Sequence, residues 1–124
     1  MFYFDHNATT PLCPAACEAW LEASEQYVGN PSSPHRLGAR AGKALLDARD
    51  QLAGFLGCSP LNIVWTSGAT ESNNLVLHHH AQSLESDAQV WISAIEHPCV
   101  VESASHHFGG RTTMLPVTSD GVLD

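Results

Sequence analysis

The sequence contains 124 residues, of which 44% are hydrophobic and 15% are charged, and its formal net charge is −8. This length and composition fit one globular domain. The acidic balance argues against a nucleic-acid partner or an acidic membrane surface, both of which require a basic face. The sequence shows no signal peptide and no apolar run of the roughly 18 residues that a membrane span needs, so we expect a cytoplasmic protein with reduced cysteines.

The N-terminal part predicts a short strand-like piece at Phe2–Phe4, a polar loop, and then a helix over about 14–27. Pro14 suits the first turn of that helix, and apolar residues recur along it at helical spacing. A loop with two prolines follows at 29–34. The sequence thus begins with a helix held between two irregular segments.

A longer amphipathic pattern follows that loop and predicts the strongest helix of the chain, with Ser33 as its N-cap and Gly57 as its stop. The opposite face, which includes Lys43 and Asp47, is expected to be solvated. The apolar face comprises Leu37, Ala41, Ala44, Leu45, Ala48, Leu52, Phe55 and Leu56.

The second half alternates between strand and helix patterns. Strands are expected at 62–66, 89–93 and 111–117, with helices from the turn after Thr66 to about Leu84 and from about Pro98 to Phe108. Alternation of this kind predicts an α/β fold with a mostly parallel sheet flanked by helices.

The turn between the first of these strands and its helix, Thr66–Asn74, is a candidate anion site. A helix N-terminus offers free backbone N–H groups and the positive end of the helix dipole. Gly68 and Ala69 allow close approach of a ligand, and the hydroxyls of Ser67 and Thr70 add possible hydrogen bonds. The alternative is that Ser67 or Thr70 simply caps the helix.

His97 follows the second strand and precedes a helix, so its loop is expected to share one crevice with the Thr66–Asn74 turn. There it could stack on a planar ligand, act as an acid or base, or merely fill a helix start. A nucleophilic pair with Cys99 is disfavoured, since we expect the two side chains to face different ways. Consecutive histidines at 78–80 diverge on a helix, so no metal site is expected.

Four separated segments together resemble the N-terminal part of a cysteine desulfurase of the NifS/IscS type, in the class V aminotransferase family. These segments are residues 4–11 (FDHNATTP), 29–38 (GNPSSPHRLG), 66–74 (TSGATESNN) and 96–97 (EH). They occur in the family's order, and the similarity spans nearly all 124 residues. The resemblance implies part of the large domain of a fold type I transferase dependent on pyridoxal 5'-phosphate (PLP).

The resemblance also implies roles for individual residues. His97 would stack on the PLP ring and assist proton transfer as the catalytic residue. Residues 1–13 would line the active site, and 14–124 would form the truncated large domain. The residues that hold PLP would be Gly68, Ala69, Thr70 and His97, and those that line the substrate pocket would be Asn7, Ala8, Thr9 and Asn30.

The implied reaction converts L-cysteine to L-alanine and leaves the sulfur as an enzyme persulfide. The sequence departs from the family because its single lysine, Lys43, matches no Schiff-base motif, and no cysteine matches the nucleophile. We therefore expect about a third of such an enzyme, inactive alone, forming a homodimer or pairing with a complementary or full-length chain and serving a sulfur-acceptor protein. A non-catalytic regulatory module and a gene fragment remain alternatives.

Overall fold

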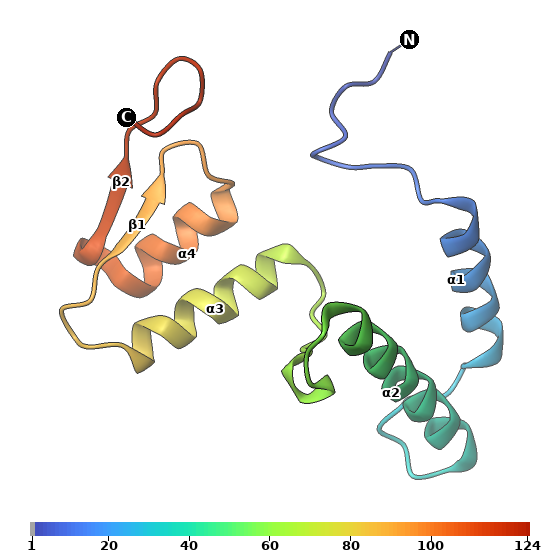
Figure 1. Ribbon diagram of the computed structural model, residues 1–124. Helices are drawn as coiled ribbons and strands as arrows, with labels where there is room; N and C mark the ends of the chain where they lie inside the picture. The colour runs from blue at the N-terminus through green and yellow to red at the C-terminus, as the bar shows by residue number, and fades with distance from the viewer. Residues whose placement is uncertain (1) are drawn as a thin grey trace. The chain divides into compact units, whose positions relative to one another are not determined.

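The computed structural model describes residues 2–124. They form two compact units, one ending at Val64 and the other beginning at Trp65. Figure 1 labels the elements along the chain. The elements are α1 (Pro14–Gln26), α2 (Arg36–Leu56), the 3-10 turn η1 (Pro60–Asn62), α3 (Ala69–Ser83), β1 (Val90–Ser93), α4 (Pro98–Phe108), the 3-10 turn η2 (Gly109–Arg111) and β2 (Thr112–Leu115).

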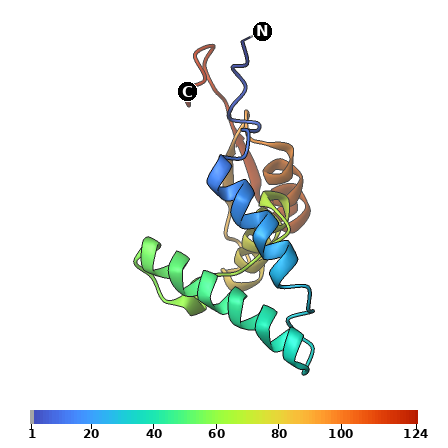
Figure 2. The same ribbon diagram turned by 90° about the vertical axis from the view of Figure 1, so that its right-hand side faces the viewer.

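The first unit contains α1, α2 and η1, and both expected helices are confirmed (Figure 2). The N-cap of α2 is His35 rather than Ser33, and its ring Nδ1 accepts a hydrogen bond of 3.2 Å from the Gly38 amide. Ser33 lies two residues before the cap position, because α2 begins at Arg36, and its amide instead closes the preceding turn on the Asn30 carbonyl. Gly57 ends α2 in the left-handed conformation, with φ of 67°, as the sequence predicts.

Gly38 is where the 29–34 loop meets α2. A Cβ built on Gly38 would lie 2.3 Å from the Ser33 carbonyl oxygen and 2.6 Å from that of Asn30. No side chain fits at that distance, so the absence of a Cβ is what allows the loop backbone to lie directly on the helix.

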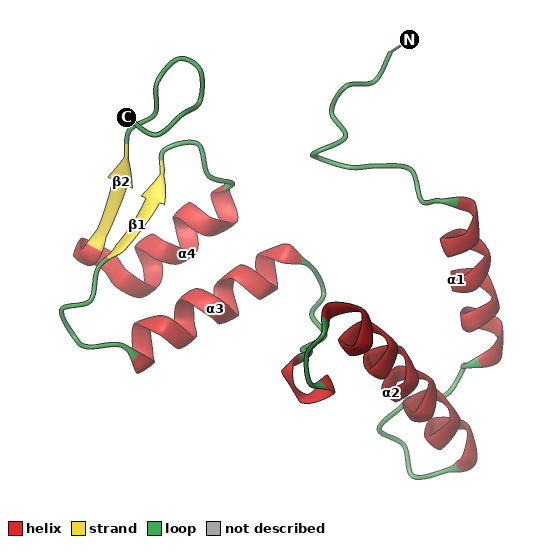
Figure 3. Ribbon diagram, in the orientation of Figure 1, coloured by secondary structure: helices red, strands yellow, loops and turns green. Residues whose placement is uncertain are grey.

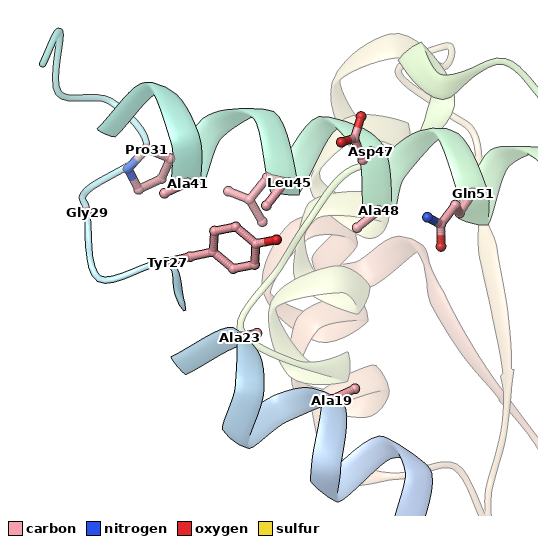
Figure 4. Close-up of a pocket in the computed structure, with 11 residues that line it drawn as sticks. Ala19, Ala23, Tyr27, Gly29, Pro31, Ala41, Leu45, Asp47, Ala48 and Gln51 are labelled. Atoms are coloured by element: carbon pink, nitrogen blue, oxygen red, sulfur yellow. The ribbon is translucent and has the colours of Figure 1, made fainter. Parts of the chain in front are cut away.

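The apolar face of α2 is less buried than the sequence predicts. Ala41 and Ala53 are buried, but Leu37 and Phe55 are 51% and 87% exposed. Small side chains of α1 and the middle of this α2 face line opposite sides of an open apolar cavity of about 710 Å³ (Figure 4). Because alanines cannot fill that space, α1 leaves much of the face uncovered within the described residues.

The expected strand at 62–66 is wrong. Residues 60–62 form η1, and Ile63 continues in an extended conformation while its carbonyl accepts a hydrogen bond from the Arg49 guanidinium. An extended segment becomes a strand only when another backbone pairs with it, and no such neighbour occurs within residues 2–124. Phe2–Phe4 likewise forms no strand.

The second unit contains a parallel strand–helix–strand arrangement (Figure 3). β1 and β2 pair with Val90 opposite Thr112 and Ser93 opposite Leu115, and α4 connects them. This confirms the parallel sheet with flanking helices. Ile92, Ala104 and Phe108 form the buried core of this unit, and the Thr112 hydroxyl donates a hydrogen bond of 3.0 Å to the Ala104 carbonyl.

Helix α3 packs along α4 (Figure 1). Its Asn74 Oδ1 lies 3.1 Å from His107 Nε2, and the rings of His78 and His107 meet edge to face with centroids 4.9 Å apart. These polar contacts join the two helices whose first turns carry the candidate site. Across residues 2–124, no helix combines the length and apolarity that crossing a bilayer requires.

Candidate functional site

The candidate site is a cavity of about 470 Å³ in the second unit, between the first turns of α3 and α4. The predicted shared crevice is therefore confirmed, and the structure brings Gly68, Ala69, Thr70 and His97 together. The complete lining consists of Ser67, Gly68, Ala69, Thr70, Glu71, Asn73, His97 and Cys99.

The N-terminus of α3 faces this cavity without a side-chain cap. Gly68 occupies the N-cap position, and no side chain accepts a hydrogen bond there, so neither Ser67 nor Thr70 caps the helix. The first amides of a helix have no intrahelical acceptor, which leaves the N–H groups of Ala69 and Thr70 for a ligand. A Cβ built on Gly68 would meet no atom within 4 Å, so there is open space beside this backbone.

Neighbouring hydroxyls are occupied within the protein. Thr66 Oγ1 and Ser72 Oγ lie 2.7 Å apart, and Ser67 Oγ donates a hydrogen bond of 2.6 Å to Glu71. The Ser67 hydroxyl, which the sequence offered as a possible donor to a ligand, therefore donates to Glu71 in this structure. By contrast, the Thr70 hydroxyl makes no hydrogen bond within residues 2–124, although it lines the cavity.

Glu71 is a site residue that the sequence analysis missed. Its Oε2 accepts hydrogen bonds of 2.6 Å from both the amide and the hydroxyl of Ser67, and these bonds hold the pKa of the carboxyl below its usual range. Glu71 is thus ionised at neutral pH beside the candidate anion site. The available signal was a glutamate in the first helical turn, which often reaches back to the preceding backbone.

His97 is the N-cap of α4. Its φ and ψ of −61° and 144° are extended, and its Nδ1 accepts a hydrogen bond of 3.1 Å from the Cys99 amide. The Cys99 Sγ lies 3.0 Å from the same nitrogen. The expectation that these side chains face different ways is therefore wrong, because an extended cap residue folds its ring back over the first helical turn.

Asn73 is the second missed residue. It lies one turn along α3 from Thr70, and its Nδ2 donates a hydrogen bond of 3.1 Å to Cys99 Sγ. No local sequence pattern indicates this contact, since it joins two helices. Asn73, His97 and Cys99 thus converge on one side of the cavity.

The residues expected to line a substrate pocket lie in the first unit. Asn7, Ala8 and Thr9 are exposed, and the turn at 6–8 is closed by hydrogen bonds from the amides of residues 8 and 9 to the Asp5 carbonyl. Asn30 Oδ1 accepts a hydrogen bond of 2.9 Å from the Ser32 amide. Their substrate role stays a prediction.

Among residues 2–124, no lysine or arginine lines the cavity of the second unit. Lys43 donates a hydrogen bond to Asp47 one turn along α2, and this contact raises the pKa of the lysine. The described part of the chain contains no group of three or more histidine, cysteine, aspartate or glutamate side chains placed to hold a metal ion. The cavity lining thus combines helix N–H groups and the Thr70 hydroxyl with a carboxylate, a side-chain amide, an imidazole and a thiol.

Comparison with known proteins gives the family. The sequence model described as aminotransferase class-V matches residues 2–124. The chain belongs to the aminotransferase class-V family.

Relatives of this aminotransferase class-V chain include a cysteine desulfurase of Rattus norvegicus, 39% identical over 126 residues, which cover 98% of this chain and 28% of the relative. A NifS/IcsS protein homolog of Lactobacillus delbrueckii is 39% identical over 127 residues, or 100% of this chain and 33% of the relative. Cysteine desulfurase IscS of Rickettsia bellii is 37% identical, over 98% of this chain and 31% of the relative. The chain thus spans about a third or less of the length of these relatives.

Proposed function

We propose that this chain is the part of a PLP-dependent cysteine desulfurase that holds the cofactor's phosphate and ring. The observation that carries the proposal is the cavity in which the uncapped N-terminus of α3, the free Thr70 hydroxyl and the His97 imidazole meet. The names of the relatives and the family match support this assignment.

The residues present fit a phosphate group. The open space beside Gly68 admits an anion next to the Ala69 and Thr70 amides, and the Thr70 hydroxyl has no competing partner within residues 2–124. The ionised Glu71 opposes the anion and weakens its binding. We infer that the site tolerates this charge because Ser67 holds the carboxylate on its own side of the turn.

PLP would supply an electron sink that stabilises negative charge at the substrate α-carbon. His97 would provide a ring for stacking and a nitrogen for proton transfer. Because Nδ1 already accepts the Cys99 N–H, the second ring nitrogen, Nε2, is the one left for exchange with a ligand.

The complete reaction in this proposal converts L-cysteine to L-alanine and passes the sulfur on as a persulfide. Lys43 is the single lysine of the sequence, and its raised pKa keeps it as an ammonium bound to Asp47. We therefore assign the Schiff-base and persulfide steps to residues outside these 124. The chain would then work as part of a dimer or with a complementary or full-length chain, and an acceptor protein would take the sulfur.

A binding titration tests the proposal. The chain is mixed with PLP, and separately with pyridoxal, which lacks the phosphate; bound cofactor is followed by fluorescence, with inorganic phosphate as competitor. We expect PLP to bind at least about tenfold more tightly than pyridoxal, because the charge-assisted contacts at α3 are lost without phosphate. Equal binding of the two compounds would overturn the cofactor assignment. Sustained release of alanine from L-cysteine would overturn the claim that the chain is inactive alone.

A further inference from the structure

Cys99 lines the cavity, and its thiol has two polar neighbours. Cys99 Sγ lies 3.0 Å from His97 Nδ1 and accepts a hydrogen bond of 3.1 Å from Asn73 Nδ2. All four cysteines are free, but no hydrogen bond to the thiol of Cys13, Cys17 or Cys58 occurs within residues 2–124. A thiol, an imidazole and an amide thus meet at Cys99 in a cavity that a small molecule can enter.

The direction of each contact favours a reactive sulfur. His97 Nδ1 accepts the Cys99 amide proton, so this nitrogen is unprotonated, and the Cys99 S–H, 3.0 Å away, is a second donor that shares its lone pair and can pass it a proton. Asn73 donates a further hydrogen bond to the same sulfur through Nδ2. The second residue of α4 also lies at the positive end of the helix dipole.

We propose that Cys99 is a nucleophilic thiol and the site at which small disulfides modify this protein. In the reaction, the S–H proton moves to His97 Nδ1, and Sγ attacks one sulfur of the disulfide. The old S–S bond breaks as the new one forms, and the departing thiolate takes the proton from His97. Electrons and atoms balance without any other reactant.

The adduct would lie in the cavity that contains Gly68 and Thr70, because Cys99 lines the same space. Modification would therefore close the anion site, and reduction would reopen it. This inference does not depend on PLP binding, since the reactivity comes from Asn73, His97 and Cys99 alone.

Cysteine-resolved labelling tests the proposal. The full chain is treated at neutral pH with limiting iodoacetamide, and separately with bis(2-hydroxyethyl) disulfide, and each cysteine is quantified by peptide mass spectrometry. Cys17 and Cys58 are half-buried like Cys99 and serve as internal references. We expect Cys99 to react about tenfold faster than either. Equal or slower reaction of Cys99 would overturn the proposal without bearing on PLP binding.

Two variants test the mechanism. His97→Asn keeps a good N-cap but removes the imidazole, and should bring the Cys99 rate to within about threefold of the Cys17 rate. Asn73→Ala should lower the Cys99 rate while leaving Cys17 unchanged. Circular dichroism checks that each variant is folded. The comparison of Cys99 with Cys17 and Cys58 uses the wild-type chain, so it does not depend on the folding of any variant. An unchanged Cys99 rate in folded His97→Asn protein would show that the imidazole does not activate the thiol.

Discussion

Glu71 Oε2 binds both the amide and the hydroxyl of Ser67, each at 2.6 Å. One carboxylate thereby occupies two donors, including the hydroxyl that the sequence offered as a possible contact for a ligand. It also places a negative charge at the helix end whose dipole attracts anions. Glu71, the third residue of α3, therefore constrains the first turn of the helix. Its charge also offsets part of the positive end of the helix dipole.

Replacing Glu71 separates these two effects. Glu71→Gln keeps an oxygen for the Ser67 amide and removes the charge, so we expect PLP or inorganic phosphate to bind roughly threefold to tenfold more tightly. Glu71→Ala removes the hydrogen bonds as well and should gain less affinity, since the turn loses its constraint. Calorimetric titration measures both variants; equal affinity of wild type and Glu71→Gln would contradict the role of the charge.

The Glu71 contact also predicts a pH dependence. The folded-state pKa of Glu71 is depressed, so its contribution to the free energy of unfolding is present above the ordinary value of 4.5 and is lost as pH falls through the folded pKa. Thermal unfolding from pH 6 to pH 3 should therefore show a smaller loss of Tm in Glu71→Gln than in wild type. The same loss in both proteins would contradict the assignment.

Thr70 is the hydroxyl we expect to bind the anion. Thr70→Val keeps the shape and removes the donor, so PLP affinity should fall by about tenfold to a hundredfold, as for the loss of a hydrogen bond to a charged group. Thr70→Ser retains a hydroxyl and should stay within about threefold of wild type. Competition by inorganic phosphate distinguishes a phosphate contact from a ring contact. Wild-type affinity in Thr70→Val would remove Thr70 from the site.

Two glycines of α2 make a matched pair for stability. Gly38→Ala places a Cβ 2.3 Å from the Ser33 carbonyl oxygen and should destabilise the first unit by about 1–3 kcal/mol, as overpacking does. Gly54 lies in the same helix, but a Cβ built on it would meet no atom within 4 Å. Gly54→Ala should therefore stabilise the first unit by about 0.5–1 kcal/mol. Urea unfolding followed by circular dichroism measures both. Effects of the same sign would contradict the close approach at Gly38.

His107 should make the packing of α3 on α4 sensitive to acid. Burial, and then the neighbouring His106 and His78, lower the pKa of His107 from 6.5. The unfolded chain therefore binds a proton more readily than the folded one, so stability is highest above pH 6.5 and falls as pH drops toward the folded pKa. His107→Gln should flatten the Tm profile between pH 7.5 and pH 5.

His79→Gln is the control for that measurement. His79 lies on α3 next to His78, but its described ring contact is with His80 and not with His107. The control variant should keep the wild-type pH profile. If it flattens the profile as much as His107→Gln does, the α3–α4 histidines are not the cause.

The helices were predictable because their signals are local, and the parallel pairing of β1 with β2 follows from the strand–helix–strand order of the chain. Prolines at the first turns, the left-handed Gly57 and the apolar spacing each act within a few residues. The strand expected at 62–66 failed because strand formation depends on a partner that local pattern does not reveal. Burial of Leu37 and Phe55 failed for the same reason, since it depends on what covers them.

Some residues of the candidate site were likewise predictable from the sequence, and others were not. The meeting of Gly68, Ala69 and Thr70 with His97 was predicted from loops at one end of a parallel sheet. The structure produces it by packing α3 on α4, because the strand expected before α3 does not form. The approach of His97 to Cys99 was missed because it depends on the extended cap geometry of a single residue. Asn73 was missed because only the packing of α3 on α4 creates its contact.

The cavity walls come from two helices, and Asn73 and Cys99, which join them, lie 26 residues apart in sequence. A molecule that touches both walls binds only while α3 and α4 are packed together. Such a ligand would stabilise the packing of the two helices. At a concentration a hundred times its Kd, it would add about 2.7 kcal/mol to the free energy of unfolding of the packed α3 and α4. Occupancy of the cavity and integrity of the second unit would thus be two measures of one equilibrium.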